Sequence, residues 1–275
     1  MAKVFNISLG VAEADEEKAD RQFVTSLARG LEVLRAFSPE DGPLGNQDLA
    51  QRTGLTKSTV SRITHTLTTL GYLDYDPRLA RYMVAPAVLS LGHACVGAAA
   101  VRRAAAPYMQ ELAEYADAAV ALGARDRLTM LYLDVARGSR TVAFSLAPGA
   151  RVPIHNTAMG AAYLSALPEK DRQFLLDAIA KANGDSWPAI RTQFETAFAD
   201  IKDHGFCLFL GTYERAMNAV GAALVQPDGT VDAFSCAATA FQFPESRLRG
   251  DIGPRLVGSI RAIAQDMRRD QTQRK

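Results

Sequence analysis

Six polar side chains lie close together between residues 57 and 65, and they are expected to form the outer face of one helix. They are Lys57, Ser58, Thr59, Ser61, Arg62 and His65. Short hydroxyl side chains suit hydrogen bonds to phosphates and base edges, and Arg62 can reach a guanine with two N–H groups. The set predicts a surface that binds nucleic acid. The alternative is a small helical core whose polar face is merely solvated.

Side chains of this kind can enter a DNA groove only if the helix that carries them is held at a fixed, tight angle by a second helix. Ala50 supplies the small residue where two helices touch, and Gly54 supplies a turn residue that tolerates a positive φ. Val60 and Ile63 follow at a spacing that anchors the second helix from its inner face. This spacing predicts a helix-turn-helix.

Signals for neighbouring helices flank this motif. An apolar row ends before Pro39 and predicts an amphipathic helix that packs on the motif. The row consists of Leu27, Leu31, Leu34 and Phe37. Asn46 is expected to cap the short helix that follows, Thr56 to cap the next helix, and Gly71 to close it.

Two short alternating runs, residues 72–75 and 81–84, lie on either side of Asp76 and predict a β-hairpin. Arg78 and Arg81 belong to this hairpin. We expect both arginines to lie on a wing that meets phosphate or the minor groove of double-stranded DNA.

The charge of the whole chain is nearly balanced, with 31 basic and 30 acidic residues and a net charge of +1. The N-terminal end of the chain departs from this balance. Residues 1–20 carry two lysines and five acidic residues, which predicts a disordered acidic tail over residues 1–21. The overall charge therefore gives no information about partners. Such information must come from where the charges lie along the chain.

The sequence gives little support for an enzyme or a metal site. The three cysteines form no CxxC pair, and the chain has no GxSxG, SxxK, P-loop or HExxH motif. His204 and Cys207 are close in sequence, but the other histidines are scattered. We expect no cofactor, no metal and no catalysis. A hydrolase with a cysteine nucleophile assisted by His155 or His204 stays as an alternative.

The longest uncharged run covers residues 82–101 and is long enough on length alone to span a bilayer. Proline, glycine and histidine interrupt it, and alanine supplies much of the rest. The N-terminus does not have the form of a signal peptide. A cytoplasmic protein without a membrane span is expected, which suits the low cysteine content.

Beyond the hairpin, the pattern predicts helices and strands in blocks. Helices are expected at residues 86–117, 157–166, 168–181, 188–203 and 245–270, and strands at 119–146, 205–210, 219–225 and 231–240. Strands followed by helices and then strands again indicate an α+β domain with a largely antiparallel sheet.

Two stretches of sequence resemble the IclR family of bacterial transcriptional regulators. The first is SLARGLEVLRAF through LGNQDLAQRTGLTKSTVSRITHTLTTLGYLDYD to RYMVAPAVLSLG, and the second runs from PGARVPIHNTAMGAAYLSALPE to DIGPRLVGSIRAIA. The resemblance implies an α+β protein of two domains, a winged helix-turn-helix and an antiparallel-sheet, GAF-like effector-binding domain. The expected boundaries are 22–85 for the DNA-binding domain, 86–104 for a linker helix and 105–275 for the effector domain.

The resemblance also implies an effector site where a loop and a helix N-terminus meet the sheet. Its expected residues are His155, Asn156, Met159, Gly160, Cys207, Phe209, Gly211, Asn218, Val220 and Cys236. The helix dipole would receive a carboxylate. Because these residues are more apolar than the common family pattern, we expect a small organic acid with a larger apolar body, for instance an aromatic one.

One recognition helix covers only a few base pairs, so specific binding implies a homodimer or homotetramer on a two-fold related operator. The Ala- and Gly-rich helix at residues 87–100 is the candidate for packing between subunits. The main alternative is a regulator of the same fold that responds to no small molecule.

Overall fold

The computed structural model describes residues 22–38, 41–98, 100–139 and 147–273. They form two compact units that divide between residues 98 and 99. The acidic tail expected at residues 1–21 and most of the strand expected after residue 140 lie outside the described residues. No described helix is both long and apolar enough to cross a membrane.

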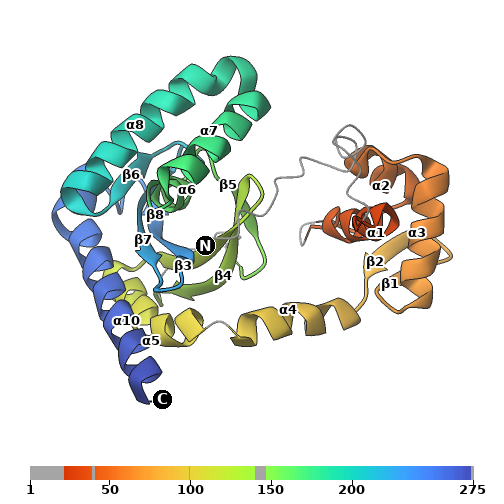
Figure 1. The fold of residues 1–275 in the computed structure, drawn as a ribbon, viewed down its shortest axis with the longest axis horizontal. Helices are drawn as coiled ribbons and strands as arrows, with labels where there is room; N and C mark the ends of the chain where they lie inside the picture. The colour runs from red at the N-terminus through yellow and green to blue at the C-terminus, as the bar shows by residue number, and fades with distance from the viewer. Residues whose placement is uncertain (1–21, 39–40, 99, 140–146, 274–275) are drawn as a thin grey trace. The chain divides into compact units, whose positions relative to one another are not determined.

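The N-terminal unit consists of helices packed against a two-stranded hairpin (Figure 1). Its elements are α1 Thr25–Arg35, α2 Asn46–Thr53, α3 Lys57–Thr69, β1 Leu73–Asp76, β2 Arg81–Val84 and α4 Ala87–Ala98. Six buried residues form its core, namely Val33, Leu44, Leu49, Val60, Leu67 and Leu73. The winged helix-turn-helix predicted from the sequence is confirmed.

Helix α1 forms as predicted, but only the second half of its expected apolar row contacts this core. Leu27 is 62% exposed and Leu31 is 51% exposed, whereas Val33 is fully buried. The core takes Val33 with partly buried Leu34 and Phe37 from the C-terminal end of the helix. The two earlier leucines stay exposed in the N-terminal part of α1.

The C-terminal unit is built on a six-stranded antiparallel sheet with strand order β5-β4-β3-β8-β7-β6. The strands are β3 Ala119–Asp126, β4 Thr129–Arg137, β5 Arg151–Pro153, β6 Cys207–Leu210, β7 Met217–Val225 and β8 Val231–Thr239. The helices are α5 Ala100–Ala116, α6 Ala158–Ser165, α7 Glu169–Asn183, α8 Trp187–His204 and α10 Gly253–Gln273. This architecture confirms the predicted antiparallel α+β domain.

Two predicted helices differ from the observed ones. The segment at 86–117 is divided into α4 and α5, and Pro107 lies inside α5. The helix expected at 245–270 begins with the short α9 Glu245–Arg247 and a π-helical turn at Leu248–Ile252, and α10 starts only at Gly253. Pro254 lacks an N–H, so it fits the first turn of a new helix better than the interior of one continuous helix.

Helices cover both faces of the sheet (Figure 1). We name them the α5/α10 face and the α6 face after the helices that pack on them. Side chains alternate along each strand, so neighbours in sequence lie on opposite faces. Val120, Phe234 and Cys236 pack on the α5/α10 face within the main core.

Helix α6 lies very close to the sheet and to the loop that precedes it. A Cβ added to Gly221 in β7 would collide with the backbone carbonyl of Ala158, and one added to Gly160 would collide with the carbonyl of Ile154. Only glycine allows backbones to approach so closely. These glycines fix the height of α6 above the sheet.

Candidate nucleic-acid interface

The corner between α2 and α3 has the geometry that the sequence predicts. Gly54 adopts φ +69°, in the left-handed region, and ends α2. Thr56 caps α3, because its hydroxyl accepts a hydrogen bond from the Thr59 N–H at 3.3 Å. Val60 and Leu67 are buried beneath α3. The corner therefore fixes which side of α3 faces away from the core.

The opposite side of α3 carries the predicted nucleic-acid-binding residues. Lys57, Ser58, Ser61, Arg62 and His65 are exposed, and Thr59 is half-buried. Three of them have partners within the domain. The Lys57 ammonium donates to the Gln47 side chain at 3.4 Å, and the hydroxyls of Ser58 and Thr59 contact the Thr56 hydroxyl at 3.1 and 2.9 Å. Their contact with DNA stays a prediction.

The start of α2 differs from the prediction. The N-cap is Gly45, not Asn46, and the Asp48 carboxylate accepts a hydrogen bond from the Gly45 N–H at 2.9 Å. Asn46 is the first helical residue, and its side-chain oxygen accepts from the Thr64 hydroxyl at 3.3 Å. Glycine and asparagine are both accepted at N-caps, so the acid three residues after Gly45 was the informative signal.

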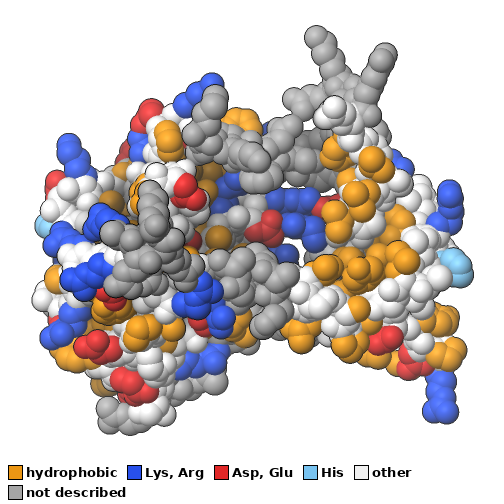
Figure 2. Space-filling model, turned by 60° about the horizontal axis from the view of Figure 1, so that its bottom comes forward, with side chains coloured by type: hydrophobic (Ala, Val, Ile, Leu, Met, Phe, Trp, Pro, Cys, Tyr) orange, Lys and Arg blue, Asp and Glu red, His pale blue; other side chains and the backbone are white. Residues whose placement is uncertain are grey.

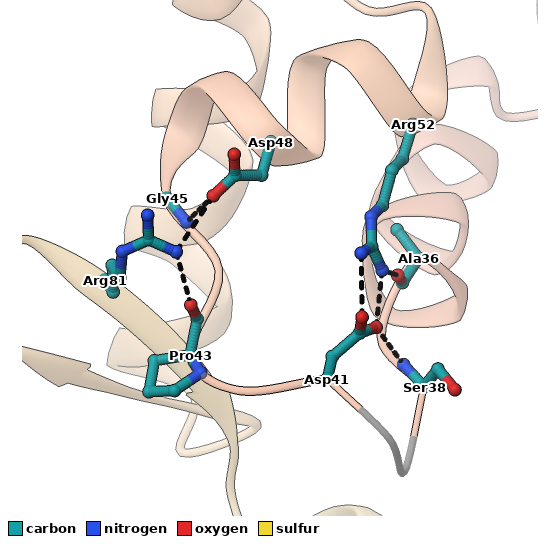
Figure 3. Close-up of polar contacts among 8 residues, drawn as sticks. All are labelled: Ala36, Ser38, Asp41, Pro43, Gly45, Asp48, Arg52 and Arg81. Atoms are coloured by element: carbon teal, nitrogen blue, oxygen red, sulfur yellow. Dashed lines mark hydrogen bonds and ion pairs between the residues drawn. The ribbon is translucent and has the colours of Figure 1, made fainter.

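The wing is a regular antiparallel hairpin in which Leu73 pairs with Val84 and Asp76 with Arg81. At its tip, the Asp76 carboxylate accepts hydrogen bonds from the backbone N–H groups of Arg78 and Leu79. The Arg78 side chain is exposed. Arg81 instead turns toward its own domain and contacts the start of α2 (Figure 3). The structure thus separates the two wing arginines that the sequence treats alike.

An ion pair between Arg52 and Asp41 closes the loop between α1 and α2 (Figure 3). The guanidinium also donates to the Ala36 carbonyl at 2.8 Å, near the end of α1. Asp41 accepts a further hydrogen bond from the Ser38 N–H, and the Arg52 guanidinium beside it holds the pKa of this carboxyl below its usual value. The arrangement ties α1 to the last turn of α2.

In the C-terminal unit, the loop before α6 holds the predicted anion-binding residues. The Thr157 hydroxyl caps α6 by accepting from the Gly160 N–H at 3.2 Å and donates to the Pro153 carbonyl at 2.8 Å. His155 is half-buried, and burial lowers its pKa. The side-chain oxygen of Asn156 is buried and has no hydrogen-bond partner among the described residues. A buried acceptor without a donor is unfavourable, so this oxygen is suited to accept from a bound molecule.

The other predicted effector residues divide between the two faces of the sheet. Cys207 lies on the α6 face, with its thiol 3.5 Å from the Ala158 carbonyl, and Phe209 follows it at the two-residue spacing of one face. Met159 and Gly160 are buried in α6 itself. Gly211 lies just after β6, in the left-handed region at φ +63°.

Three predicted residues lie on the other side. Asn218, Val220 and Cys236 share the α5/α10 face, where the Asn218 side chain donates to the Phe243 carbonyl at 2.9 Å. The sheet therefore separates them from the start of α6, and the structure does not bring them into one pocket with His155. The sequence analysis grouped these residues by their order along the chain and did not apply the two-residue alternation of a strand, which places neighbouring side chains on opposite faces.

The α6 face carries polar and aromatic residues that the sequence analysis did not select. Ser235 lies between the core residues Phe234 and Cys236 and so points to the α6 face, where it is 8% exposed. Tyr132 pairs with Gly123, whose Cα faces the Met159 side chain. Burial and then the nearby Tyr213 raise the pKa of Tyr132. Strand alternation in the sequence would have found Ser235.

A cation also lies at this face. Arg125 is two residues beyond Gly123 in β3, and its guanidinium donates to the Tyr163 hydroxyl of α6 at 3.3 Å. It donates a second hydrogen bond to the Arg127 carbonyl at 3.1 Å. The face therefore combines aromatic rings, a buried carbonyl acceptor and a partly buried guanidinium.

A surface groove lies elsewhere, at the C-terminal end of α8 against the start of α10. Its lining residues are Asp203, His204, Phe206, Arg249, Pro254, Val257 and Arg261. None of them belongs to the predicted effector set. Arg249 in this groove is already paired with Asp200 and Glu245. Among the described residues, none that lines the groove has a buried side-chain oxygen without a partner, as Asn156 has beside α6.

The two cysteine thiols that the structure describes, those of Cys207 and Cys236, are poorly placed for nucleophilic chemistry. Cys207 and Cys236 are fully buried, and burial raises the pKa of both thiols. A thiolate is the reactive form of cysteine, and burial in apolar surroundings disfavours it. His204 is exposed whereas Cys207 is buried, so the two do not form a reactive pair.

Both units match known protein domains. Residues 26–77 match the IclR helix-turn-helix domain, and residues 93–269 match the Bacterial transcriptional regulator IclR C-terminal domain. The two matches cover the helix-turn-helix, the first strand of the wing and nearly all of the C-terminal unit.

Relatives and solved structures agree with these matches. The chain is 36% identical over 248 residues to the HTH-type transcriptional regulator TsaQ1/TsaQ2 of Comamonas testosteroni, covering 89% of each chain. The crystal structure of an IclR family transcriptional regulator from Brucella abortus superposes with a TM-score of 0.87 and 43% identity, covering 96% of this chain and 99% of that one. An IclR homologue from Microbacterium hydrocarbonoxydans, solved with 4-hydroxybenzoate, shares the fold at a TM-score of 0.68 and 17% identity, covering 88% and 99%. The chain belongs to the IclR family of bacterial transcriptional regulators.

Proposed function

We propose that this DNA-binding regulator reads its operator with the exposed face of α3 in the major groove and with Arg78 of the wing at the adjacent backbone or minor groove. The observation that carries the proposal is the division of α3 into a buried side, with Val60 and Leu67, and an exposed polar side. Arg62 is the residue with the reach for a bidentate contact to guanine. The regulator works in the cytoplasm and controls a catabolic operon.

The regulator acts as a homodimer or homotetramer on a two-fold related operator. Exposed leucines of the N-terminal unit support this proposal, because Leu27 and Leu31 in α1 and Leu89 and Leu91 in α4 are each more than half exposed. Figure 2 shows hydrophobic side chains gathered over this unit. Exposed apolar side chains that gather on a small domain mark an interaction site. A second copy would cover it and provide the second reading helix.

The effector is an organic acid with an aromatic body, and it binds on the α6 face. Tyr132, Tyr213 and Met159 supply aromatic and apolar contacts, and the start of α6 together with Arg125 attracts the carboxylate. The orphan oxygen of Asn156 accepts a hydrogen bond from a ring hydroxyl. The homologue solved with 4-hydroxybenzoate supports this class of ligand. Effector binding favours one of two spacings between the two DNA-binding domains of the dimer and so changes operator affinity.

A two-step experiment tests the proposal. The full chain first selects double-stranded fragments from a random DNA library, and the enriched fragment serves as the probe in gel shifts. Thermal unfolding is then followed with 4-hydroxybenzoate, benzoate, glyoxylate and pyruvate. At a ligand concentration one hundred times Kd, the stabilisation is about 2.7 kcal/mol. We expect 4-hydroxybenzoate to stabilise the protein and to change the gel shift.

Matched outcomes separate the parts of the proposal. Asn156→Ala should remove the preference for 4-hydroxybenzoate over benzoate while leaving benzoate binding in place. Enrichment of no DNA sequence would overturn the reading surface. Stabilisation by the short oxo-acids alone, or by none of the four acids, would overturn the aromatic effector.

A further inference from the structure

Arg81 stands at the first position of strand β2, where the wing meets the start of α2. Its Nη1 donates to the Pro43 carbonyl at 2.7 Å and to the Asp48 carboxylate at 3.1 Å (Figure 3). The next residue, Tyr82, exchanges two backbone hydrogen bonds with Leu44, at 2.9 and 2.8 Å. The wing is therefore attached to the segment before α2 by both backbone and side-chain contacts.

The same carboxylate serves two elements. Asp48 accepts from the Gly45 N–H at the start of α2 and from Arg81 of the wing. Its side chain is 39% exposed and that of Arg81 is 45% exposed, so the pair lies at the surface. The helix before a recognition helix runs beside the DNA backbone in this motif. An unpaired Asp48 there would repel phosphate, and Arg81 neutralises it.

We propose that Arg81 is a positioning residue, which holds the wing at a fixed angle to α2 through Asp48 and Pro43, and that it is not primarily a phosphate contact. The inference rests on the proposed reading surface. Arg78, at the tip of the same hairpin, supplies the direct backbone contact. Its side chain has no partner within the described residues, so nothing in the fold competes with DNA for it.

The salt dependence of binding separates the two roles. The slope of log K against log salt concentration is negative, and each phosphate contact that is lost makes it less steep by about 0.9. Arg78→Ala should therefore flatten the slope by about one contact. Arg81→Ala should weaken binding by about 5-fold or more. In the Asp48→Asn background, where no unpaired carboxylate is left to repel phosphate, Arg81→Ala should leave the slope unchanged, because it removes a contact within the protein.

A double-mutant cycle on the selected DNA fragment completes the test. Asp48→Asn keeps an acceptor for the Gly45 N–H but removes the charge. We expect it to weaken binding by the otherwise wild-type protein and to leave binding unchanged or improve it in the Arg81→Ala background. Arg81→Lys, which retains a donor and the charge, should restore part of the lost affinity. Hydroxyl-radical footprints of Arg81→Ala should lose protection at the flank that the wing covers and keep it where α3 binds.

The outcomes decide the inference independently of the proposed function. If Arg81→Ala flattens the salt slope as Arg78→Ala does, and Asp48→Asn has the same effect in both backgrounds, Arg81 is a phosphate contact and the inference is wrong. If the wild-type chain selects no DNA, the reading surface itself fails. Thermal unfolding of each variant shows whether the domain is folded, and Arg81→Lys supplies the comparison if Arg81→Ala is not.

Discussion

Arg62 projects from the exposed side of α3, six residues beyond the Thr56 cap, and its planar guanidinium can donate two parallel hydrogen bonds. Replacing it with alanine should cost about 1–3 kcal/mol of operator affinity and relax the base preference at one position. The measurement is a gel shift on the selected fragment and on fragments with single base changes.

Arg62→Lys is the matched control for this prediction. Lysine keeps the charge but lacks the fork, so the variant should keep the salt slope while losing discrimination between bases. An Arg62→Ala variant that binds the selected fragment as tightly as the wild-type protein would show that the reading face has been assigned to the wrong residues.

Asp41 and Arg52 should give the N-terminal unit a stability that depends on pH. The pKa of Asp41 is lowered by its hydrogen bond from Arg52, by that from the Ser38 N–H and by the Arg52 charge. A carboxyl with a lowered folded-state pKa stabilises the fold above its unfolded value of 3.8. That contribution is lost as pH falls through the folded-state value. The unfolding temperature of the wild-type protein should exceed that of Asp41→Asn at about pH 6, and the difference should shrink below about pH 4.

The Arg52→Ala background provides the control for the pH effect. There, Asp41→Asn should change the unfolding temperature less than in the wild-type background, because the main group that lowers the pKa of Asp41 is gone and only the hydrogen bond from the Ser38 N–H remains. A wild-type advantage that persists unchanged at low pH would contradict the assignment. The sequence did not show this pair, since Asp41 and Arg52 are 11 residues apart and only the folded loop brings them together.

At the scale of elements, the corner between α2 and α3 depends on the left-handed backbone of Gly54. A side chain there would meet nothing within 4 Å, so alanine is disfavoured by conformation alone. Gly54→Ala should destabilise the unit by about 1–2 kcal/mol. Gly30→Ala, in the middle of α1 and also free of contacts, should stabilise it by about 0.5–1 kcal/mol. Hydrogen exchange of the α3 amides measures both effects.

The two glycine variants should change the free energy of unfolding in opposite directions. Both add the same methyl group in open space, so only the backbone conformation differs between them. If Gly54→Ala left the exchange of α3 amides unchanged, the corner would not need a left-handed residue. Operator affinity should fall with Gly54→Ala, because the angle of α3 sets which side chains enter the groove.

Helices, strands and turns were predictable from the sequence where a local signal defines them. They were less predictable where tertiary packing determines their bounds or the direction of their side chains. The cap of α3 by Thr56 and the turn at Gly54 follow from residue type and spacing. The face of a strand follows from alternation, but only once its pairing is fixed. Val220 and Cys236 were therefore grouped with the start of α6, although they pack on the α5/α10 face. Such a grouping joins residues that the sheet separates, although the fold itself is predicted correctly.

At the scale of the whole molecule, the order of the two units was predictable because each carries its own pattern of periodicity. The exposure of Leu27 and Leu31 in α1 was not predictable, because an apolar stripe at helical spacing indicates burial but does not identify the partner that buries it. Leu27 and Leu31 obey the pattern and yet remain exposed in a single chain. This mismatch between pattern and burial is the reason to expect a second copy.

The variant Leu27→Glu/Leu31→Glu tests that expectation. Because both side chains are exposed in the single chain, the substitutions should change its unfolding free energy by no more than about 0.5 kcal/mol each. Buried glutamates at a subunit contact would oppose association, and loss of the second reading helix should weaken operator binding by roughly 100-fold or more. Sedimentation velocity and gel shifts measure the two effects. Val225→Glu, an equally exposed apolar site in the C-terminal unit, is the control. A leucine variant that sediments and binds like the wild-type protein would show that subunits associate through another surface.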